Sequence, residues 1–92
     1  MILCLDVGNS HIFGGLFDGQ ELKLTFRKPT PQTTSSDELG LFFRSVLREN
    51  GFEQDDVSDV AICSVVPRLV YSISASIQKY FDIEPFILKA GV

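Results

Sequence analysis

The chain opens with an apolar run from Met1 to Val7 that only Asp6 interrupts. A continuous run of this kind is typical of a strand that is buried on both faces of a sheet. Gly8 and Asn9 follow it and indicate a tight turn. A second run, rich in apolar residues, extends from His11 to Phe17. The pattern therefore predicts a central strand that turns directly into a second strand.

A third strand is indicated by strict alternation after the Asp18-Gly19 turn, which is a frequent hairpin signal. Its apolar residues are Leu22, Leu24 and Phe26, and the polar residues between and after them are Lys23, Thr25 and Arg27. A period of two is typical of a strand with one exposed face. Pro29 ends the strand, and basic side chains such as Lys28 protect a free strand edge. We expect an antiparallel meander with this strand at the edge.

Two helices are predicted in the second half of the pattern. The first begins after Ser35, which forms a plausible capping box with Glu38, and it ends at Asn50-Gly51. Its apolar face has helical spacing and consists of Leu39, Phe42, Phe43, Val46 and Leu47. The second helix begins at Pro67, because a missing N–H costs nothing in the first turn. Its apolar face consists of Val70, Ile73, Ile77 and Phe81.

Two further strands complete the pattern. The segment from Val57 to Val66 is nearly all apolar and rich in β-branched residues, which predicts another buried strand, and Pro85 to Leu88 predicts a short final one. The predicted order is β-β-β-α-β-α-β. This order favours an α/β fold with a mixed sheet, in which an antiparallel meander is followed by parallel strands joined by right-handed crossovers.

The composition is that of one small domain, and it argues against some classes of binding partner. The 92 residues are 45% hydrophobic and 22% charged, as in ordinary globular domains. The net charge of −4 does not favour binding to nucleic acid, which normally requires clustered Lys and Arg. No apolar stretch approaches the ~20 residues of a membrane span. We therefore expect neither a nucleic acid partner nor a membrane partner.

The two cysteines bear on localisation. Cys4 and Cys63 lie in apolar runs and have no Cys or His neighbour at metal-ligand spacing. We expect both to be reduced, buried side chains of a cytoplasmic protein, because a positively charged leader is also missing at the N-terminus. A disulfide between the two cysteines is the alternative.

The strongest candidate for chemistry is the turn after the first strand, Asp6-Val7-Gly8-Asn9-Ser10. Gly8 allows a phosphate to approach the backbone N–H groups, and Asn9 and Ser10 add short polar donors. Asp6, at the carboxyl end of a strand, can hold Mg²⁺ directly or through water, since Mg²⁺ binds through few carboxylates plus phosphates. A plain hairpin, in which Asp6 and Asn9 satisfy turn amides, is the alternative interpretation.

Other polar residues have more ordinary interpretations. His11 has no carboxylate or cysteine partner in sight and is treated as structural. Gly14-Gly15 is interpreted as relief of crowding at a β-bulge. Asp37 and Glu38 suit the first turn of a helix through its dipole. No Ser-His-Asp set, paired catalytic carboxylates or Walker-type loop is visible.

Two residues near the end of the fourth predicted strand are candidate ligand contacts. Ser64 lies where open α/β sheets commonly place their ligands. Arg68 lies at the start of the second helix. It could contact a substrate or a phosphate, but a solvated charge at a helix start is the more ordinary interpretation.

Together, these residues resemble the type III pantothenate kinases of the actin-like ATPase and sugar-kinase superfamily. The resemblance rests on Asp6-Val7-Gly8-Asn9-Ser10, on Arg27, on Asp37-Glu38, on Cys63-Ser64-Val65-Val66-Pro67 and on Tyr80-Phe81. It covers essentially the whole chain. It implies a ribonuclease H-like fold. The element order of that fold is the same as the order predicted above.

The resemblance also implies an activity and its cofactors: transfer of the γ-phosphoryl group of ATP to the 4′-hydroxyl of pantothenate, the entry step to coenzyme A. Mg²⁺ and a monovalent cation, K⁺ or NH4⁺, are implied with it, as is a homodimer. In the family, the matching loop binds the ATP phosphates, and here it comprises Asp6, Val7, Gly8, Asn9, Ser10, His11, Ile12 and Phe13, with Asp6 close to the metal. Ser10 replaces the more common Thr and keeps the hydroxyl.

The family's Gly-Ala-Asp-Arg segment, which carries the catalytic base, is not present in this sequence, and its place would be after Val92. We therefore expect residues 1–92 to be the N-terminal ribonuclease H-like nucleotide-binding domain, incomplete and without its second domain. By themselves these residues should show no kinase activity. Two alternatives remain open: a regulatory or nucleotide-binding module of the same fold, and another small-molecule kinase, such as a sugar or acetate kinase.

Overall fold

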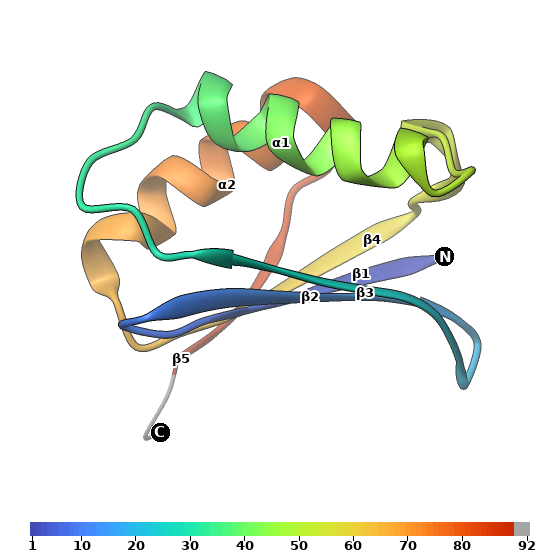
Figure 1. Ribbon diagram of the computed structural model, residues 1–92, viewed down its shortest axis with the longest axis horizontal. Helices are drawn as coiled ribbons and strands as arrows, with labels where there is room; N and C mark the ends of the chain where they lie inside the picture. Colours follow the sequence, from blue (N-terminus) through green and yellow to red (C-terminus); the bar gives the residue numbers. More distant parts are fainter. Residues whose placement is uncertain (90–92) are drawn as a thin grey trace.

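A single five-stranded mixed sheet, in the order β3-β2-β1-β4-β5, organises the computed structural model, which describes residues 1–89 (Figure 1). The central strand β1 pairs antiparallel with β2 and parallel with β4, and β3 forms one edge. The predicted meander, the parallel strands and the edge position are all confirmed. The strands are β1 (Ile2–Val7), β2 (His11–Asp18), β3 (Glu21–Pro29), β4 (Asp59–Ser64) and β5 (Phe86–Lys89). The last residues of the expected domain, 90–92, lie outside the described residues.

Two helices, α1 (Ser36–Glu49) and α2 (Pro67–Phe81), lie side by side on the same face of the sheet (Figure 1). The predicted start of each helix is confirmed. The hydroxyl of Ser35 accepts a 3.1 Å hydrogen bond from the N–H of Glu38, and Pro67 occupies the first turn of α2. A short 3-10 helix, η1 (Gln54–Asp56), precedes β4 and was not predicted. Strand β4 is also shorter at both ends than the expected segment from Val57 to Val66.

The prediction that the apolar strands are buried on both faces is wrong. In β1, Leu3, Leu5 and Val7 are at most 2% exposed, whereas Ile2 is 41% exposed and Cys4 is half-buried. The cause is the placement of both helices on one face, so that alternate side chains of each strand point to the opposite, uncovered face. The expected burial of Cys4 and Cys63 fails for the same reason, although both thiols are free as predicted.

The Gly14-Gly15 pair does not mark a bulge. The irregularity in the pairing of β2 with β3 falls between Leu16 and Phe17 instead. The Phe26 ring of β3 packs directly on Gly14, where a Cβ atom would overlap the ring. The small side chain at position 14 therefore makes room for an aromatic side chain of the neighbouring strand.

The contact between α1 and α2 centres on Tyr80. A Cβ atom at Gly40 would overlap the Tyr80 ring, so the two helices approach closely at this point. The Tyr80 hydroxyl donates a 2.7 Å hydrogen bond to Oδ1 of Asp37, and Nζ of Lys79 lies 2.7 Å from the same oxygen. Asp37 therefore links the two helices, a role beyond the helix-dipole interpretation given to it from sequence.

These contacts shift the ionisation of all three groups. Hydrogen bonds from Lys79 and Tyr80 lower the pKa of Asp37 below its ordinary value of 3.8. The bond to Asp37 raises the pKa of Lys79 and the pKa of Tyr80. A lowered carboxyl pKa stabilises the folded state above the ordinary pKa, and this contribution is lost as the pH falls through the lowered value.

Asp37→Asn should therefore lower the melting temperature slightly at pH 7, because the carboxylate charge that holds Lys79 and Tyr80 is removed. Below pH 3.8 the difference from the wild type should shrink and disappear as Asp37 itself becomes protonated. Melting temperatures measured by circular dichroism between pH 7 and pH 2 test this. Asp55→Asn is the control, because Asp55 is an exposed acid whose side chain makes no hydrogen bond to residues 1–89. A difference that stays constant down to pH 2 would contradict the prediction.

Gly40→Ala should destabilise the protein by roughly 1–2 kcal/mol, because overpacking against Tyr80 outweighs the better helix propensity of alanine. In a Tyr80→Ala background the same substitution should instead stabilise the protein by up to about 1 kcal/mol, since the ring is gone and the helix propensity remains. Urea unfolding of the four proteins in this double-mutant cycle measures both signs. Destabilisation in both backgrounds would rule out the Tyr80 ring as the cause.

Candidate phosphate-binding site

The turn between β1 and β2 is a narrow hairpin at the carboxyl end of the central strand. The N–H of Gly8 donates a 2.9 Å hydrogen bond to the carbonyl of His11, which closes the turn. A Cβ atom at Gly8 would lie 3.2 Å from that carbonyl oxygen, so glycine suits the tight closure. The side chains of Asn9 and Ser10 are exposed at the tip. The hairpin predicted from sequence is therefore present, with its two short polar side chains accessible.

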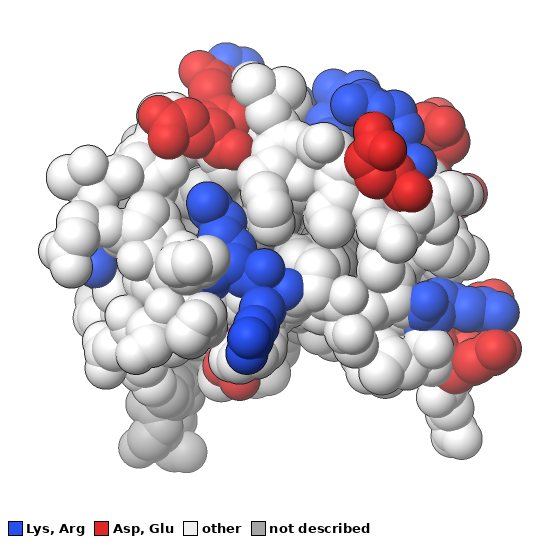
Figure 2. Space-filling view, in the orientation of Figure 1, with Lys and Arg blue, Asp and Glu red and all other residues white. Residues whose placement is uncertain are grey.

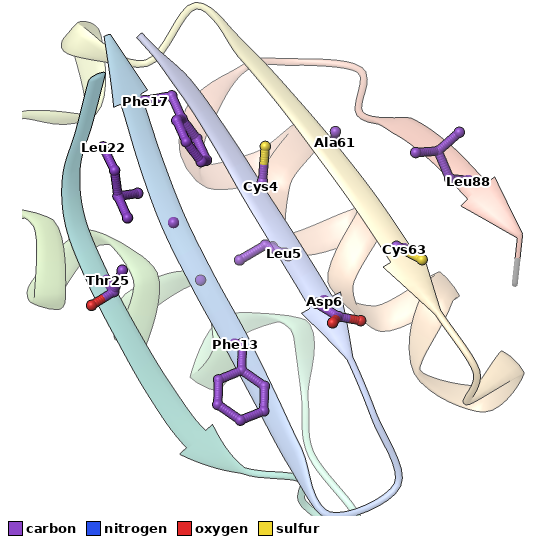
Figure 3. A pocket seen from close by; sticks show the side chains of 12 residues that line it. Cys4, Leu5, Asp6, Phe13, Phe17, Leu22, Thr25, Ala61, Cys63 and Leu88 are labelled. Atoms are coloured by element: carbon purple, nitrogen blue, oxygen red, sulfur yellow. The ribbon is translucent and has the colours of Figure 1, made fainter. Parts of the chain in front are cut away.

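Asp6 lies on the uncovered face of the sheet, near the carboxyl end of β1 (Figure 3). Its Cα is paired with Phe13 of β2 and with Cys63 of β4. The carboxylate is exposed and makes no hydrogen bond to residues 1–89, so it does not satisfy the turn amides. This geometry removes the plain-hairpin role from Asp6 and leaves its oxygens available to a ligand.

The remaining residues of the predicted loop fall into two groups. The side chains of Val7 and Ile12 are fully buried beneath the helices, so only their backbone can face a ligand. His11 is half-buried with its ring 6.0 Å from that of Phe13, and Phe13 is 48% exposed on the uncovered face. The tip and Asp6 thus form the accessible part of the site.

A threonine that the sequence did not single out supports the hairpin. The hydroxyl of Thr30 donates a 2.7 Å hydrogen bond to the carbonyl of Gly8, and its N–H donates a 2.8 Å bond to the carbonyl of Ser10. Thr30 directly follows β3, whose end lies beside the start of β2. In the sequence, only the position of Thr30 directly after the proline that ends β3 could have indicated this role. Thr30 lies in a polar segment, and nothing in the sequence distinguishes it from the other polar residues there.

Ser64 and Arg68 build the neighbouring end of β4 rather than a free binding surface. The Ser64 hydroxyl accepts a 2.9 Å hydrogen bond from the N–H of Val66 and donates to the carbonyl of the same residue. The Arg68 guanidinium donates to the carbonyls of Pro31 and Gln32, at 3.2 and 3.3 Å. Arg68 is exposed, as expected of a solvated charge, and its hydrogen bonds also join α2 to the segment after β3.

The residues present could hold Mg²⁺ only if water and phosphate oxygens supplied most of its ligands. No group of three or more His, Cys, Asp or Glu side chains converges within residues 1–89. One exposed carboxylate at the strand end next to the hairpin fits Mg²⁺, which commonly uses one or two carboxylates and completes its shell with water and substrate phosphates. Asp6 therefore suits a metal that arrives with a nucleotide and not a metal held by protein ligands alone.

A shallow cavity of about 440 Å³ lies on the uncovered sheet face next to Asp6 (Figure 3). Apolar side chains such as Phe13, Phe17 and Leu88 line it, together with both cysteines. Cys4 is paired with Ala61, two residues before Cys63 on β4. The two cysteine Cα atoms are therefore roughly 8 Å apart, beyond the reach of a disulfide.

Charged side chains form separate groups on the surface (Figure 2). On the face shown, most basic groups have acidic ones close by, and Lys23 for example pairs with Glu21 at 3.1 Å. Within residues 1–89, neither helix is long and apolar enough to cross a membrane.

The fold is shared with solved structures of other proteins. ROK hexokinase from Thermus thermophilus superposes with a TM-score of 0.71 at 21% sequence identity, covering 96% of this chain and 33% of that one. The ethanolamine utilization protein EutJ from Carboxydothermus hydrogenoformans gives 0.64 at 12% identity, over 92% and 42% of the two chains. The chain therefore shares the fold of these proteins, and the ribonuclease H-like α/β fold expected from the sequence is confirmed.

Sequence comparison is more specific than the fold. The model of the type III pantothenate kinase family matches residues 2–92, and the chain belongs to that family. Type III pantothenate kinases of Legionella pneumophila (strain Corby) and Elusimicrobium minutum are 58% and 52% identical over all 92 residues. The chain spans 36% of the length of each of these relatives.

Mild oxidation should not join Cys4 to Cys63, because their Cα separation exceeds the disulfide range. The intact mass after treatment with oxidised glutathione should show mixed disulfides or no change, and no loss of two hydrogens from an internal bridge. Recovery of a peptide that links the two residues after digestion would contradict the pairing of β1 with β4.

Proposed function

We propose that the complete protein transfers the γ-phosphoryl group of ATP to pantothenate, forming 4′-phosphopantothenate, the first step of coenzyme A biosynthesis. The observation that carries the proposal is a family-matched hairpin with unengaged polar groups at the carboxyl end of β1. Its exposed tip, Asn9 and Ser10, offers N–H and side-chain donors, and Asp6 offers a free carboxylate. Donors for phosphate and a carboxylate for metal are the groups that phosphoryl transfer requires.

Within this proposal, the segment from Asp6 to Phe13 forms the ATP site and Asp6 lies next to Mg²⁺. Bound Mg²⁺ would neutralise negative charge on the phosphates. Asn9 and Ser10 would orient the phosphates from the hairpin tip. Val7 and Ile12 would contribute through their backbone and by fixing the hairpin on the core, since both side chains are buried.

The proposal extends to the remaining features that the family implies. They are a monovalent cation, K⁺ or NH4⁺, a homodimer in the cytoplasm, and a division in which residues 1–92 form the N-terminal nucleotide-binding domain. The catalytic base and the pantothenate pocket would be supplied by chain outside these residues. Residues 1–92 alone should then release no ADP in response to pantothenate, because acceptor activation needs that base.

In the complete protein, Asp6→Asn should reduce kcat/KM for ATP by roughly 100-fold, about 2.7 kcal/mol, because the amide keeps the shape but loses the charge next to the metal. Turnover would be followed as ADP release with pantothenate at saturating Mg²⁺. Asp18→Asn is the matched control, since Asp18 is an exposed acid at the far end of β2 and should leave turnover unchanged. Undiminished turnover of Asp6→Asn would remove Asp6 from the metal site.

The same assay separates the alternative functions. A regulatory module would bind ATP without turning over pantothenate. A sugar or acetate kinase would release ADP with a different acceptor, so hexoses and acetate belong in the acceptor panel. ADP release that depends on pantothenate alone supports the proposal.

A further inference from the structure

The segment that follows β3 contacts the hairpin between β1 and β2 through Thr30. Thr30 bonds to two hairpin carbonyls, that of Gly8 through its hydroxyl at 2.7 Å and that of Ser10 through its N–H at 2.8 Å. Twenty or more residues separate Thr30 from both partners, so these bonds depend on the tertiary fold. Thr30 is half-buried, which limits competition from water.

The bond to the Gly8 carbonyl also sets the direction of an N–H group. The Gly8 carbonyl and the Asn9 N–H belong to one peptide unit, and residues 1–89 contain no cis peptide bond. In a trans peptide the C=O and N–H point in opposite directions. Holding the carbonyl toward Thr30 therefore turns the Asn9 N–H away from Thr30.

At the hairpin tip, two carbonyl acceptors are engaged in hydrogen bonds, whereas two N–H donors are free of partners in the described part of the chain. The carbonyls of Gly8 and Ser10 are both bonded to Thr30, whereas the N–H groups of Asn9 and Ser10 have no partner within residues 1–89. A phosphate is attracted by free N–H groups and repelled by free carbonyl oxygens. Glycine at position 8 would readily allow this peptide to rotate, since it has no side chain to oppose the change.

The segment that carries Thr30 is itself held in place from the other side. Arg68, in the first turn of α2, donates to the carbonyls of Pro31 and Gln32. At the end of β4, the N–H of Val65 donates a 3.1 Å bond to the carbonyl of Val7, just before the hairpin. The hairpin, the segment after β3 and the start of α2 are thus connected by hydrogen bonds.

We propose that Thr30 is a positioning residue for nucleotide binding: its hydroxyl locks the Gly8–Asn9 peptide so that the Asn9 N–H serves the ATP phosphates. This inference rests on the proposed phosphate-binding role of the hairpin. Thr30 itself does not touch the nucleotide. It acts by preventing the Gly8 carbonyl from turning into the anion site.

The test compares Thr30→Val, Thr30→Ser and Thr33→Val in the complete protein. Thr30→Val removes the hydroxyl but keeps the shape and the backbone bond to Ser10. Thr30→Ser restores the hydroxyl, and Thr33 is an exposed threonine of the same segment whose side chain makes no hydrogen bond to residues 1–89. Calorimetry would give Kd for ATP, and ADP release would give KM for each substrate.

We expect Thr30→Val to raise Kd and KM for ATP by roughly 3–10-fold, the value of one hydrogen bond, with KM for pantothenate within about twofold. Thr30→Ser should recover most of this loss, and Thr33→Val should match the wild type. An unchanged Kd for ATP in Thr30→Val overturns the proposal. So does a variant that unfolds, or one in which both substrates weaken together, because either result describes a merely structural threonine.

The wild-type measurements distinguish this inference from the function on which it rests. A wild type that binds ATP but leaves pantothenate unphosphorylated contradicts the proposed kinase activity, while Kd for ATP still decides the role of Thr30. A wild type that does not bind ATP overturns both.

Discussion

The pairing of β1 with two neighbours of opposite direction is the constraint on which the rest of the structure depends. Leu3, Leu5 and Val7 bury one side of this strand under the helices. Because β2 runs antiparallel to β1, the chain must turn sharply at the carboxyl end of β1. Because β4 runs parallel to β1, the end of β4 and the start of α2 arrive at the same edge. The site is thus a consequence of strand direction.

The same edge collects supporting groups from distant parts of the chain. β3 runs antiparallel to β2, so its end, with Thr30, lies beside the hairpin. The first turn of α2 brings Arg68 to the segment after Thr30. The site therefore combines a few exposed polar groups at the tip with a layer of backbone hydrogen bonds behind them. Such a layer keeps the tip rigid without occupying the surface that a ligand needs.

The two faces of the sheet differ in a way that affects the chemistry. Both helices cover one face, and Tyr80 and Asp37 hold them together there. Asp6 lies on the other face, and its carboxylate is exposed and free of hydrogen bonds to residues 1–89. A carboxylate beneath the helices would need a buried partner to remain charged. On the uncovered face, the Asp6 carboxylate needs no buried partner and stays accessible from solvent.

The elements, their order and the hairpin could be predicted from the sequence, because apolar periodicity, caps and turn residues are local signals. It predicted the start of each helix, the mixed sheet and the accessible residues Asn9 and Ser10. It could not show which strand faces are covered, since that depends on where α1 and α2 pack, and so the burial of Cys4 and Cys63 was predicted wrongly. The roles of Thr30, Arg68 and Asp37 depend on the tertiary structure, because their hydrogen bonds join residues twenty or more positions apart.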